Sequence, residues 1–434
     1  MSDAFSMSRR RRAKNSNIVS VLDVGSYKVC CLIGELEQSY ATTGVRGQKF
    51  RLLGIGHQRS QGISSGAVVN LRQAQAAVST AISQAEQMSG VNVENVYLAI
   101  ACGNPHSRTF DGHVDVTEGI VGDADIARLE AGARAFAVHD GSALLSLNRI
   151  VFGLDAVPDV SDPRGLAARR LYANHHAVTV DPNALRNLCL LLESCHVEPV
   201  TLLPAGFASA LAVTTEAERR TGVTCIDIGS GVASIASFAD GHFVYAASIP
   251  IGGQQVTHEL AHALAVSLAE AERIKTLYGS LILTASDEHE IVPLTREADG
   301  PDGLPEMTRA EVARIVAGSM YRLLMRIRQC LDGCGVARVR SAGVVLTGGV
   351  SDVLGLEEFA AGHLARPVRI AAAPRLDGAA GRLPGSVSSP AFSCATGLAL
   401  AAATPPLLIP VRERKTQVRQ GYFGRIEQWL RESF

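Results

Sequence analysis

Two segments roughly two hundred residues apart carry the same pattern. VSVLDVGSYKVCCLIGEL occupies positions 19–36, and VTCIDIGSGVASIASFAD occupies positions 223–240. Each segment is an apolar strand, an Asp-x-Gly-Ser turn and a second strand of small, β-prone residues. A repeat with so long a period excludes a solenoid of short units. The duplication therefore predicts two related half-molecules, each of which opens with the same hairpin.

Length, charge and cysteine usage narrow the class of protein. A chain of 434 residues is long enough for two to four domains. The 41 Lys and Arg residues against 42 Asp and Glu leave a net charge of −1, which gives no support for binding nucleic acid. The nine cysteines have no CxxC or Cys/His ligand spacing, so no zinc site or disulfide framework is predicted. Residues 1–17 form a basic tail, which we expect to be disordered. We expect no transmembrane helix.

Strands and helices alternate along the rest of the chain, which predicts a mixed α/β fold. Three strands of a meander lead into a helix that ends at Gly90. Residues 93–181 then read as a β-α-β-β unit that interrupts the first half: a strand at 93–103, a helix at 123–139, and strands at 146–157 and 170–181. After the second hairpin we expect a helical region within 247–279, a helix at 308–335, a loop at 296–306, a strand at 344–350 and further helices at 355–365 and 392–402.

The two Asp-Gly turns suggest a phosphate site. Glycine N–H groups in a tight turn cradle phosphate oxygens, here at Gly25 and at Gly229–Gly231. Ser26 adds a hydroxyl and Lys28 a cation, while Asp23 and Asp227 would hold the water shell of Mg²⁺. A single turn of this kind is more often a structural β-turn. Two in equivalent places favour a pair of hairpins that clamp a triphosphate.

Two further motifs each have two interpretations. In VVLTGGV at 344–350, Gly348 and Gly349 after Thr347 either let the backbone approach adenine or its ribose, or form a simple strand-to-helix turn. In AERIK at 271–275, Glu272 and Lys275 share a helix face. They either form a surface ion pair or hold the ribose and base.

The order of these motifs resembles the actin/Hsp70/sugar-kinase superfamily. It runs Asp23-x-Gly-Ser-x-Lys28, Asp227-x-Gly-Ser-Gly231, Ala271-Glu-x-Ile-Lys275 and Leu346-Thr-Gly-Gly349. Within the superfamily the chain resembles the bacterial cell-division FtsA family from Ile18 to its last residue. The segments LLGIGHQRSQGISSGAVVNL and VYLAIACGN are specific to that resemblance. It implies ATP and Mg²⁺ as ligands, and it adds Tyr27, Gly206, Ser230 and Val350 to the nucleotide site.

The resemblance also implies an actin-like division of the chain, in which an inserted subdomain 1C replaces actin's subdomain 1B. The expected units are subdomain 1A at 18–92 and 182–212, 1C at 93–181, 2A at 213–249 and 338–402, 2B at 250–337, a linker at 403–420 and a terminal helix at 421–434. One departure concerns chemistry. Val232, Ala233 and Ser234 stand where relatives have a hydroxyl residue and a second acid, so we expect at most a slow ATPase.

The terminal segment GYFGRIEQWLRESF predicts an amphipathic helix at a membrane surface. Its apolar residues fall within an arc of roughly 140° at 100° per residue, and arginines flank that arc. A helix that packs on the protein's own body is the other interpretation. The chain's only Trp and the linker before it favour the membrane. The predicted membrane residues are Tyr422, Phe423, Arg425, Ile426, Trp429, Leu430, Arg431 and Phe434.

The resemblance implies an ATP-binding protein at the cytoplasmic face of the inner membrane, at the division septum. It would form filaments, tether FtsZ through the FtsZ C-terminal segment with contacts in residues 250–337, and recruit other divisome proteins to an anionic phospholipid surface. No nucleic acid partner is expected. Two alternatives within the superfamily are a sugar or acid kinase, for which the chain has no substrate signature, and a pilus-assembly ATP-binding protein, which generally lacks such a terminal helix.

Overall fold

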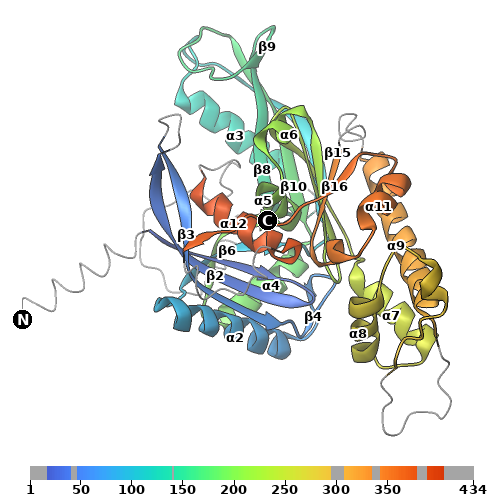
Figure 1. Cartoon of the computed structure of the whole chain (residues 1–434). Helices are drawn as coiled ribbons and strands as arrows, with labels where there is room; N and C mark the ends of the chain where they lie inside the picture. Colours follow the sequence, from blue (N-terminus) through green and yellow to red (C-terminus); the bar gives the residue numbers. More distant parts are fainter. Residues whose placement is uncertain are drawn as a thin grey trace, which may run out of the picture.

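The computed structural model describes residues 17–40, 46–138, 141–294, 307–334, 343–378 and 389–404. It contains two main sheets and an inserted subdomain that projects from one end of the molecule (Figure 1). The predicted loop at 296–306, the tail at 1–16 and the terminal segments beyond residue 404 lie outside the described residues. In the part that is described, no helix has the length and apolar character needed to cross a membrane.

The first sheet has the strand order β11-β6-β1-β2-β3-β17. The predicted meander is confirmed, since β1, β2 and β3 pair antiparallel in sequence, and β6 and β11 then add in parallel. Helix α2 (Leu71–Ser89) packs on β2 and β3, and it ends where predicted, at Gly90 in the left-handed conformation. The strands are β1 (Ile18–Val24), β2 (Lys28–Tyr40), β3 (Arg46–Arg59), β6 (Asn95–Ile100), β11 (Glu198–Pro204) and β17 (Asp377–Gly378).

The second sheet repeats the first, with the order β14-β13-β12-β15-β16. Its hairpin has the same register as the first hairpin when 204 is added to each position, because Asp23 pairs with Cys30 and Asp227 pairs with Ser234. The predicted duplication is therefore present in the backbone pairing. The strands are β12 (Val223–Ile228), β13 (Ala233–Ala239), β14 (His242–Ile249), β15 (Gly343–Thr347) and β16 (Val368–Ile370).

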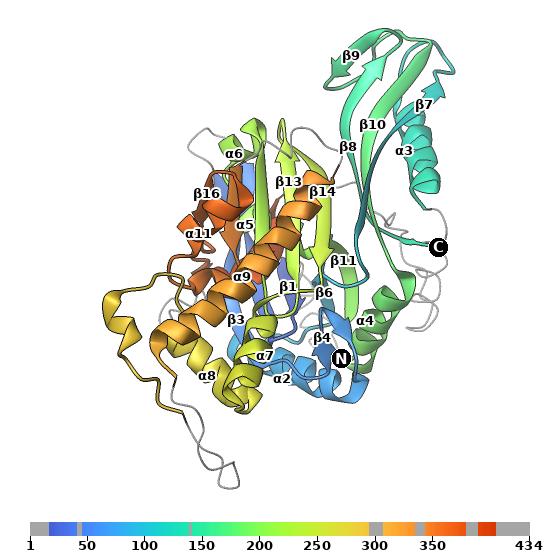
Figure 2. The ribbon, with the colours of Figure 1, turned by 90° about the vertical axis from the view of Figure 1, so that its right-hand side faces the viewer.

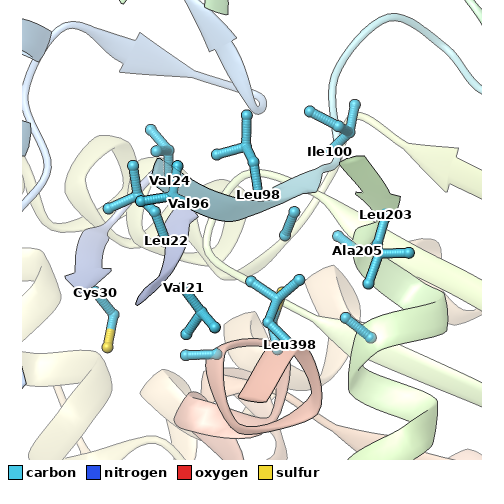
Figure 3. Close-up of a cluster of buried hydrophobic side chains, with 14 of the residues drawn as sticks. Val21, Leu22, Val24, Cys30, Val96, Leu98, Ile100, Leu203, Ala205 and Leu398 are labelled. Carbon is cyan, nitrogen blue, oxygen red and sulfur yellow. The ribbon is translucent and has the colours of Figure 1, made fainter. Parts of the chain in front are cut away.

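Two helices, α5 (Ala205–Val213) and α12 (Ser393–Ala403), are packed tightly against each other and against both sheets. Their composition explains this position, because both are apolar on nearly every face and almost all of their residues are buried. Figure 3 shows Leu398 of α12 among side chains of the first sheet, with Val21 and Leu98 nearby. One hydrophobic core thus joins the two halves through this helix pair.

A second core lies between the second sheet and a layer of helices. The longest of these, α9, is the predicted amphipathic helix and crosses this side of the molecule in Figure 2. It starts at a capping box in which Thr308 and Glu311 each accept from the other's backbone N–H. The helices are α7 (Gly253–Leu264), α8 (Leu268–Tyr278), α9 (Arg309–Asp332) and α11 (Leu356–Leu364), while α4 (Pro182–Ser194) and α6 (Glu216–Thr221) lie elsewhere on the body.

The inserted subdomain corrects the sequence prediction at its first strand. The strand predicted at 93–103 as part of the insert is β6, which pairs with β1 and β11 in the first sheet. The insert's own first strand is β7, which the sequence analysis missed because an edge strand with alternating exposure reads as polar. The insert comprises β7 (His106–Asp115), α3 (Asp123–Ala137), β8 (Ala143–Leu154), β9 (Val157–Val160) and β10 (Arg170–Val180), in the sheet order β7-β10-β8-β9.

Candidate nucleotide-binding site

The two Asp-Gly turns have the same geometry and touch each other. Gly25 N–H donates to the Lys28 carbonyl at 3.0 Å, and Gly229 N–H donates to the Val232 carbonyl at 2.9 Å. A Cβ added to Gly231 would lie 2.7 Å from Ser26 Oγ, so the tips of the two turns are in contact. The fold therefore brings together two motifs that the sequence separates by roughly two hundred residues.

The two carboxylates lie beneath these turns. Burial raises the pKa of Asp23 and raises that of Asp227 to about 6. A hydrogen bond at 2.5 Å from Ser209 Oγ to Asp227 Oδ2 and the positive charge of Lys28 act in the opposite direction. Each half thus supplies one buried carboxyl group whose charged form is disfavoured.

Lys28 connects the first hairpin to the segment that precedes α12. Its Nζ donates to the Ala391 carbonyl at 2.5 Å and lies 3.1 Å from the centre of the Phe392 ring. Burial lowers the pKa of Lys28, and the nearby Asp23 and Asp227 charges partly offset that effect. Lys28 therefore fastens the first hairpin to the segment before α12 and interacts electrostatically with both carboxylates.

The donor set fits Mg²⁺ bound largely through water. No group of three or more His, Cys, Asp or Glu side chains converges within the described ranges. Two acidic groups, one from each half, match the requirement of Mg²⁺ for one or two carboxylates together with phosphate oxygens and several waters. Asp23 and Asp227 are the residues that would hold the water shell.

The two glycines of the Thr347-Gly348-Gly349 motif differ in how much space surrounds them. Gly348 has φ +91°, and a Cβ there would lie 2.3 Å from Asp227 Oδ1, so packing against the second turn requires this glycine. Gly349 has open space around it, with the Ala391 Cβ 3.8 Å away as the nearest contact. Thr347 is buried, and its Oγ1 lies 2.6 Å from Ser393 Oγ on α12. Gly349 is thus the residue of the motif with room for a ligand.

Glu272 and Lys275 form more than a surface pair. Lys275 Nζ lies 2.6 Å from Glu272 Oε2 and also donates to Thr257 Oγ1 on α7 at 2.8 Å. The start of α7 is bonded in turn to the second hairpin, because Gly253 N–H donates to the Gly229 carbonyl at 3.0 Å. This network places the pair beside the second Asp-Gly turn. Val350 belongs to the same region, since a Cβ on Gly253 would lie 2.8 Å from Val350 Cγ2.

Three further predicted site residues, Gly206, Tyr27 and Ser230, have other surroundings. Gly206 packs α5 against β13, because a Cβ there would lie 2.8 Å from the backbone of Ile235. Tyr27 stands at the tip of the first turn with 47% of its surface exposed, and the Arg59 guanidinium lies 5.5 Å from its ring centre. Ser230 is joined to α7 through its carbonyl, which accepts from Gln254 N–H at 2.7 Å.

Sequence reasoning missed three contributors to the site: Ser209, the 390–392 turn and the loop at 62–66. Ser209 is a polar residue in a helix that is otherwise apolar, which is a usable signal for a buried hydrogen bond. The loop lies in the segment LLGIGHQRSQGISSGAVVNL, which the sequence analysis used only as a mark of resemblance. Phe392 gives no such local signal, since its contact with Lys28 spans most of the chain.

Similar solved structures define the class of the fold. They include the PilM-PilN type IV pilus biogenesis complex, with a TM-score of 0.59, 16% identity and coverage of 89% of this chain and 99% of that chain. MreB5 of Spiroplasma citri bound to ADP has a TM-score of 0.50, 13% identity and coverage of 89% and 96%. The protein is accordingly a mixed α/β protein with the actin-like fold.

The chain belongs to the FtsA family of cell division proteins. It is 33% identical over 430 residues to the cell division protein FtsA of Agrobacterium fabrum, covering 97% of this chain and 96% of that protein. The FtsA of Escherichia coli is 28% identical over 431 residues, with 98% and 100% covered. The family profile "Cell division protein FtsA" matches residues 224–397, and "SHS2 domain inserted in FTSA" matches residues 102–179. The second match begins after β6, in agreement with the corrected start of the insert.

Proposed function

We propose that this cell division protein binds ATP between its two halves and, as an actin-like filament at the cytoplasmic face of the inner membrane, tethers FtsZ to the division septum. The facing Asp-Gly turns, with Asp23, Lys28 and Asp227 beneath them, carry the ATP part of this proposal. Family membership and the terminal sequence pattern support the tethering part.

Each group of the site has a distinct task in this proposal. The N–H groups of Gly25 and Gly229–Gly231, the Ser26 hydroxyl and the Lys28 ammonium bind the phosphates. Asp23 and Asp227 would hold the waters of Mg²⁺, and the ion would supply positive charge to neutralise the phosphates. Turnover is slow, because the residue across the ladder from Asp227 is Ser234, whose hydroxyl is too weak a base to activate water.

Isothermal titration tests the ATP site. We expect Asp227→Ala and Gly349→Asp to lower Mg-ATP affinity at least tenfold, because one removes a charge partner and the other places a carboxylate where the ligand approaches. Asp162→Ala, an exposed carboxylate in the insert, is the control and leaves affinity unchanged. Unchanged ATP affinity in both site variants would show that ATP does not bind at this site. Rapid steady-state phosphate release would contradict the expectation of slow turnover.

For the FtsZ C-terminal segment we propose the groove between α7 and α9, within residues 250–337. Its volume is about 610 Å³, and two histidines and two arginines are among its lining residues. Arg322 pairs with Glu259 and Arg314 pairs with Glu288, so an acidic peptide would exchange with these carboxylates as it binds. Ile315→Glu should weaken binding of an FtsZ C-terminal peptide, measured by fluorescence anisotropy, whereas Leu190→Glu on α4 should not. Equal affinity of both variants for the peptide would show that it binds outside this groove. The lining residues are Gln255, His258, Glu259, His262, Arg314, Ile315, Gly318 and Arg322.

The membrane proposal rests on the sequence of residues 421–434, which lie outside the described part of the chain. Lipid co-sedimentation with and without these residues tests it, and Trp429→Glu should abolish vesicle binding while ATP binding stays intact. Arg425→Glu should weaken binding most at low salt. If Trp429 fluorescence shows neither a blue shift nor protection from an aqueous quencher on anionic vesicles, the membrane tether fails.

Filament formation completes the proposal. One terminal helix binds a bilayer weakly, because partial apolar burial is offset by the entropy lost on ordering a tether. A filament presents many such helices to one surface and raises their effective concentration. It also presents repeated surfaces to other divisome proteins. Vesicle binding that rises steeply with protein concentration is expected, and a linear dependence would argue against cooperative assembly.

A further inference from the structure

Two partly accessible thiols lie close together at the end of α9. The structure describes all nine cysteines, of which six are buried and three are half-buried. The half-buried ones are Cys195, Cys330 and Cys334. Cys330 is in the last turn of α9, and Cys334 follows the capping residue Gly333, whose backbone is still right-handed helical. Residues four apart on a helix share a face, so these two thiols are neighbours.

Both thiols lie near Tyr245 of β14, on which α9 packs (Figure 2). The Tyr245 hydroxyl is 3.2 Å from Cys330 Sγ. Tyr245, Cys330 and Cys334 all pack against the core of the second half. Burial raises the pKa of Tyr245, and the hydrogen bond to Cys330 and the charges of both thiols act in the same direction. A phenol and two thiols therefore meet where the helix end contacts the strand.

The two thiols can form a disulfide once the helix end shifts. Cβ atoms four residues apart on a helix are about 5–6 Å from each other, whereas a disulfide needs about 3.5–4.5 Å. The last turn must therefore move by about 1–2 Å. The hydrogen bond from Gly333 N–H to the Gln329 carbonyl at 3.0 Å resists this movement. A disulfide formed against such resistance is strained, and strained disulfides are the most easily reduced.

We propose that Cys330 and Cys334 form a reversible disulfide when the protein meets hydrogen peroxide, and that this bond releases Tyr245 from α9. In a reducing compartment such a disulfide is transient and regulatory rather than structural. Neither thiol belongs to the proposed ATP site, so this inference does not depend on the proposed function.

The oxidation takes two steps. Burial raises the pKa of the Cys330 thiol, so Cys330 is the slower nucleophile and Cys334 reacts first. The Cys334 thiolate attacks one peroxide oxygen, the O–O bond breaks, and hydroxide leaves to become water, which gives a sulfenic acid. The Cys330 thiolate then attacks the Cys334 sulfur, the S–O bond breaks, and a second water forms. Two thiols lose two electrons and two protons, and one peroxide is reduced to two waters.

The disulfide affects the strand that borders the insert. Cys330 loses its S–H and its sulfur moves with the helix end, so the contact with the Tyr245 hydroxyl is broken. Tyr245 is followed by Ala246, whose N–H donates to Ser107 Oγ of the insert at 3.2 Å. Oxidation at the end of α9 therefore loosens β14 at the place where the inserted subdomain is attached.

Peptide mapping by mass spectrometry tests the disulfide in the full chain. Trypsin cleaves after Arg328 and Arg338, so Cys330 and Cys334 fall in one peptide that has no other cysteine. After native protein is treated with hydrogen peroxide and then alkylated, this peptide should have lost two hydrogens and carry no alkyl group. Dithiothreitol should reverse the change. In Cys330→Ser the reaction should stop at the sulfenic acid of Cys334, which dimedone traps.

Cys195→Ser is the matched control, because Cys195 is also half-buried but has no second thiol among its hydrogen-bond partners. Its sulfur contacts the Ser79 hydroxyl at 3.5 Å and the Gln75 carbonyl at 3.8 Å. This variant should form the 330–334 disulfide as readily as wild type does.

Hydrogen–deuterium exchange measures the structural consequence. Oxidised wild type should exchange about fivefold faster than reduced wild type at the end of α9 and around Tyr245, which is the effect of losing one ordinary hydrogen bond. Reduced Tyr245→Phe should already show the faster exchange in β14, and oxidation should add nothing there.

The wild-type protein alone decides the first part of the inference. If both thiols of the peptide 329–338 remain open to alkylation after peroxide treatment, or if either pairs with Cys195 or with a second chain, the disulfide is overturned. If the disulfide forms and exchange in β14 does not change, the release of Tyr245 is overturned.

Discussion

Asp227 carries a fully buried carboxyl group, and its ionisation affects the stability of the fold. Burial raises the pKa of its carboxyl group from 3.8 to about 6, so the folded state holds the proton more tightly than the unfolded state does. The free energy of unfolding therefore falls as the pH rises from about 4 to about 6, and the loss is complete above that range. For a shift of this size the loss is on the order of 3 kcal/mol.

We expect Asp227→Asn to raise the melting temperature of the ligand-free protein at pH 7.5 and to lose that advantage near pH 4. Asparagine keeps the size and still accepts the hydrogen bond from Ser209, but it carries no charge to desolvate. Scanning calorimetry at the two pH values measures the effect. Asp162→Asn, on the exposed surface, should give no stabilisation. A lower melting temperature for Asp227→Asn at pH 7.5 would show that the buried carboxylate does not destabilise the ligand-free protein.

The adjacent glycines Gly348 and Gly349 should respond differently to alanine. At Gly348 the left-handed backbone and the contact of a Cβ with Asp227 predict a loss of about 2–4 kcal/mol. At Gly349 no atom is close to the added Cβ, so the change should stay within about 0.5 kcal/mol. Urea unfolding of the two variants makes the comparison. Equal midpoints would mean that Gly348 is not required by packing.

At the scale of elements, the crossing of α5 and α12 depends on one glycine. A Cβ on Gly397 would lie 1.7 Å from the Ala208 carbonyl oxygen, so the two helix backbones are in direct contact. Gly397→Ala must push the helices apart inside the shared core, which we expect to cost about 3 kcal/mol. Gly362→Ala on α11 is the matched control, because its Cβ meets nothing within 4 Å. That change should be neutral or stabilise by up to about 1 kcal/mol. If the denaturant midpoints of Gly397→Ala and Gly362→Ala fall equally, the close packing of α5 on α12 does not require glycine at position 397.

At the scale of the whole molecule, a buried polar network joins the insert to the second half. His176 Nδ1–H donates to Asn148 Oδ1 at 3.0 Å, and its Nε2 accepts from Ser107 Oγ at 2.6 Å. Asn148 Nδ2 donates to the Phe243 carbonyl on β14 at 2.7 Å, and Ala246 N–H donates to Ser107 Oγ at 3.2 Å. Burial lowers the pKa of His176 to about 3, consistent with a neutral ring. The insert thus satisfies backbone groups of an edge strand that belongs to the other half.

We expect Asn148→Ala to destabilise the protein by about 2–4 kcal/mol, because it removes the acceptor of His176 Nδ1–H and the side-chain donor to the Phe243 carbonyl in the interior. Hydrogen exchange in β14 should accelerate in the same variant. Asn174→Ala is the control, since Asn174 bonds Asp111 near the surface of the same sheet. Unchanged exchange in β14 for Asn148→Ala would show that the insert is not fastened to the second half by this network.

The local and repeated features of this protein were predictable from its sequence alone. Strand alternation, Asp-Gly turn chemistry and helix caps are properties of neighbouring residues, so the duplicated hairpins, α2 with its end at Gly90, and α9 were all predictable. The same local chemistry pointed to Asp23, Lys28 and Asp227 as the centre of the site. Because the hairpin is repeated, the sequence also indicated that each half contributes one Asp-Gly turn.

Contacts between segments far apart in the chain were not predictable from the sequence and emerge only in the folded molecule. β6 joins the first sheet because its apolar side chains fit between β1 and β11, and a strand's sequence does not name its partners. The contact of Phe392 with Lys28, the bond from Gly66 to Ser26 and the requirement for glycine at Gly348 likewise arise from atoms far apart in the chain. The burial of a side chain and the partners of its hydrogen bonds depend on the packing of the complete fold. They therefore determine contacts that a local sequence pattern does not specify.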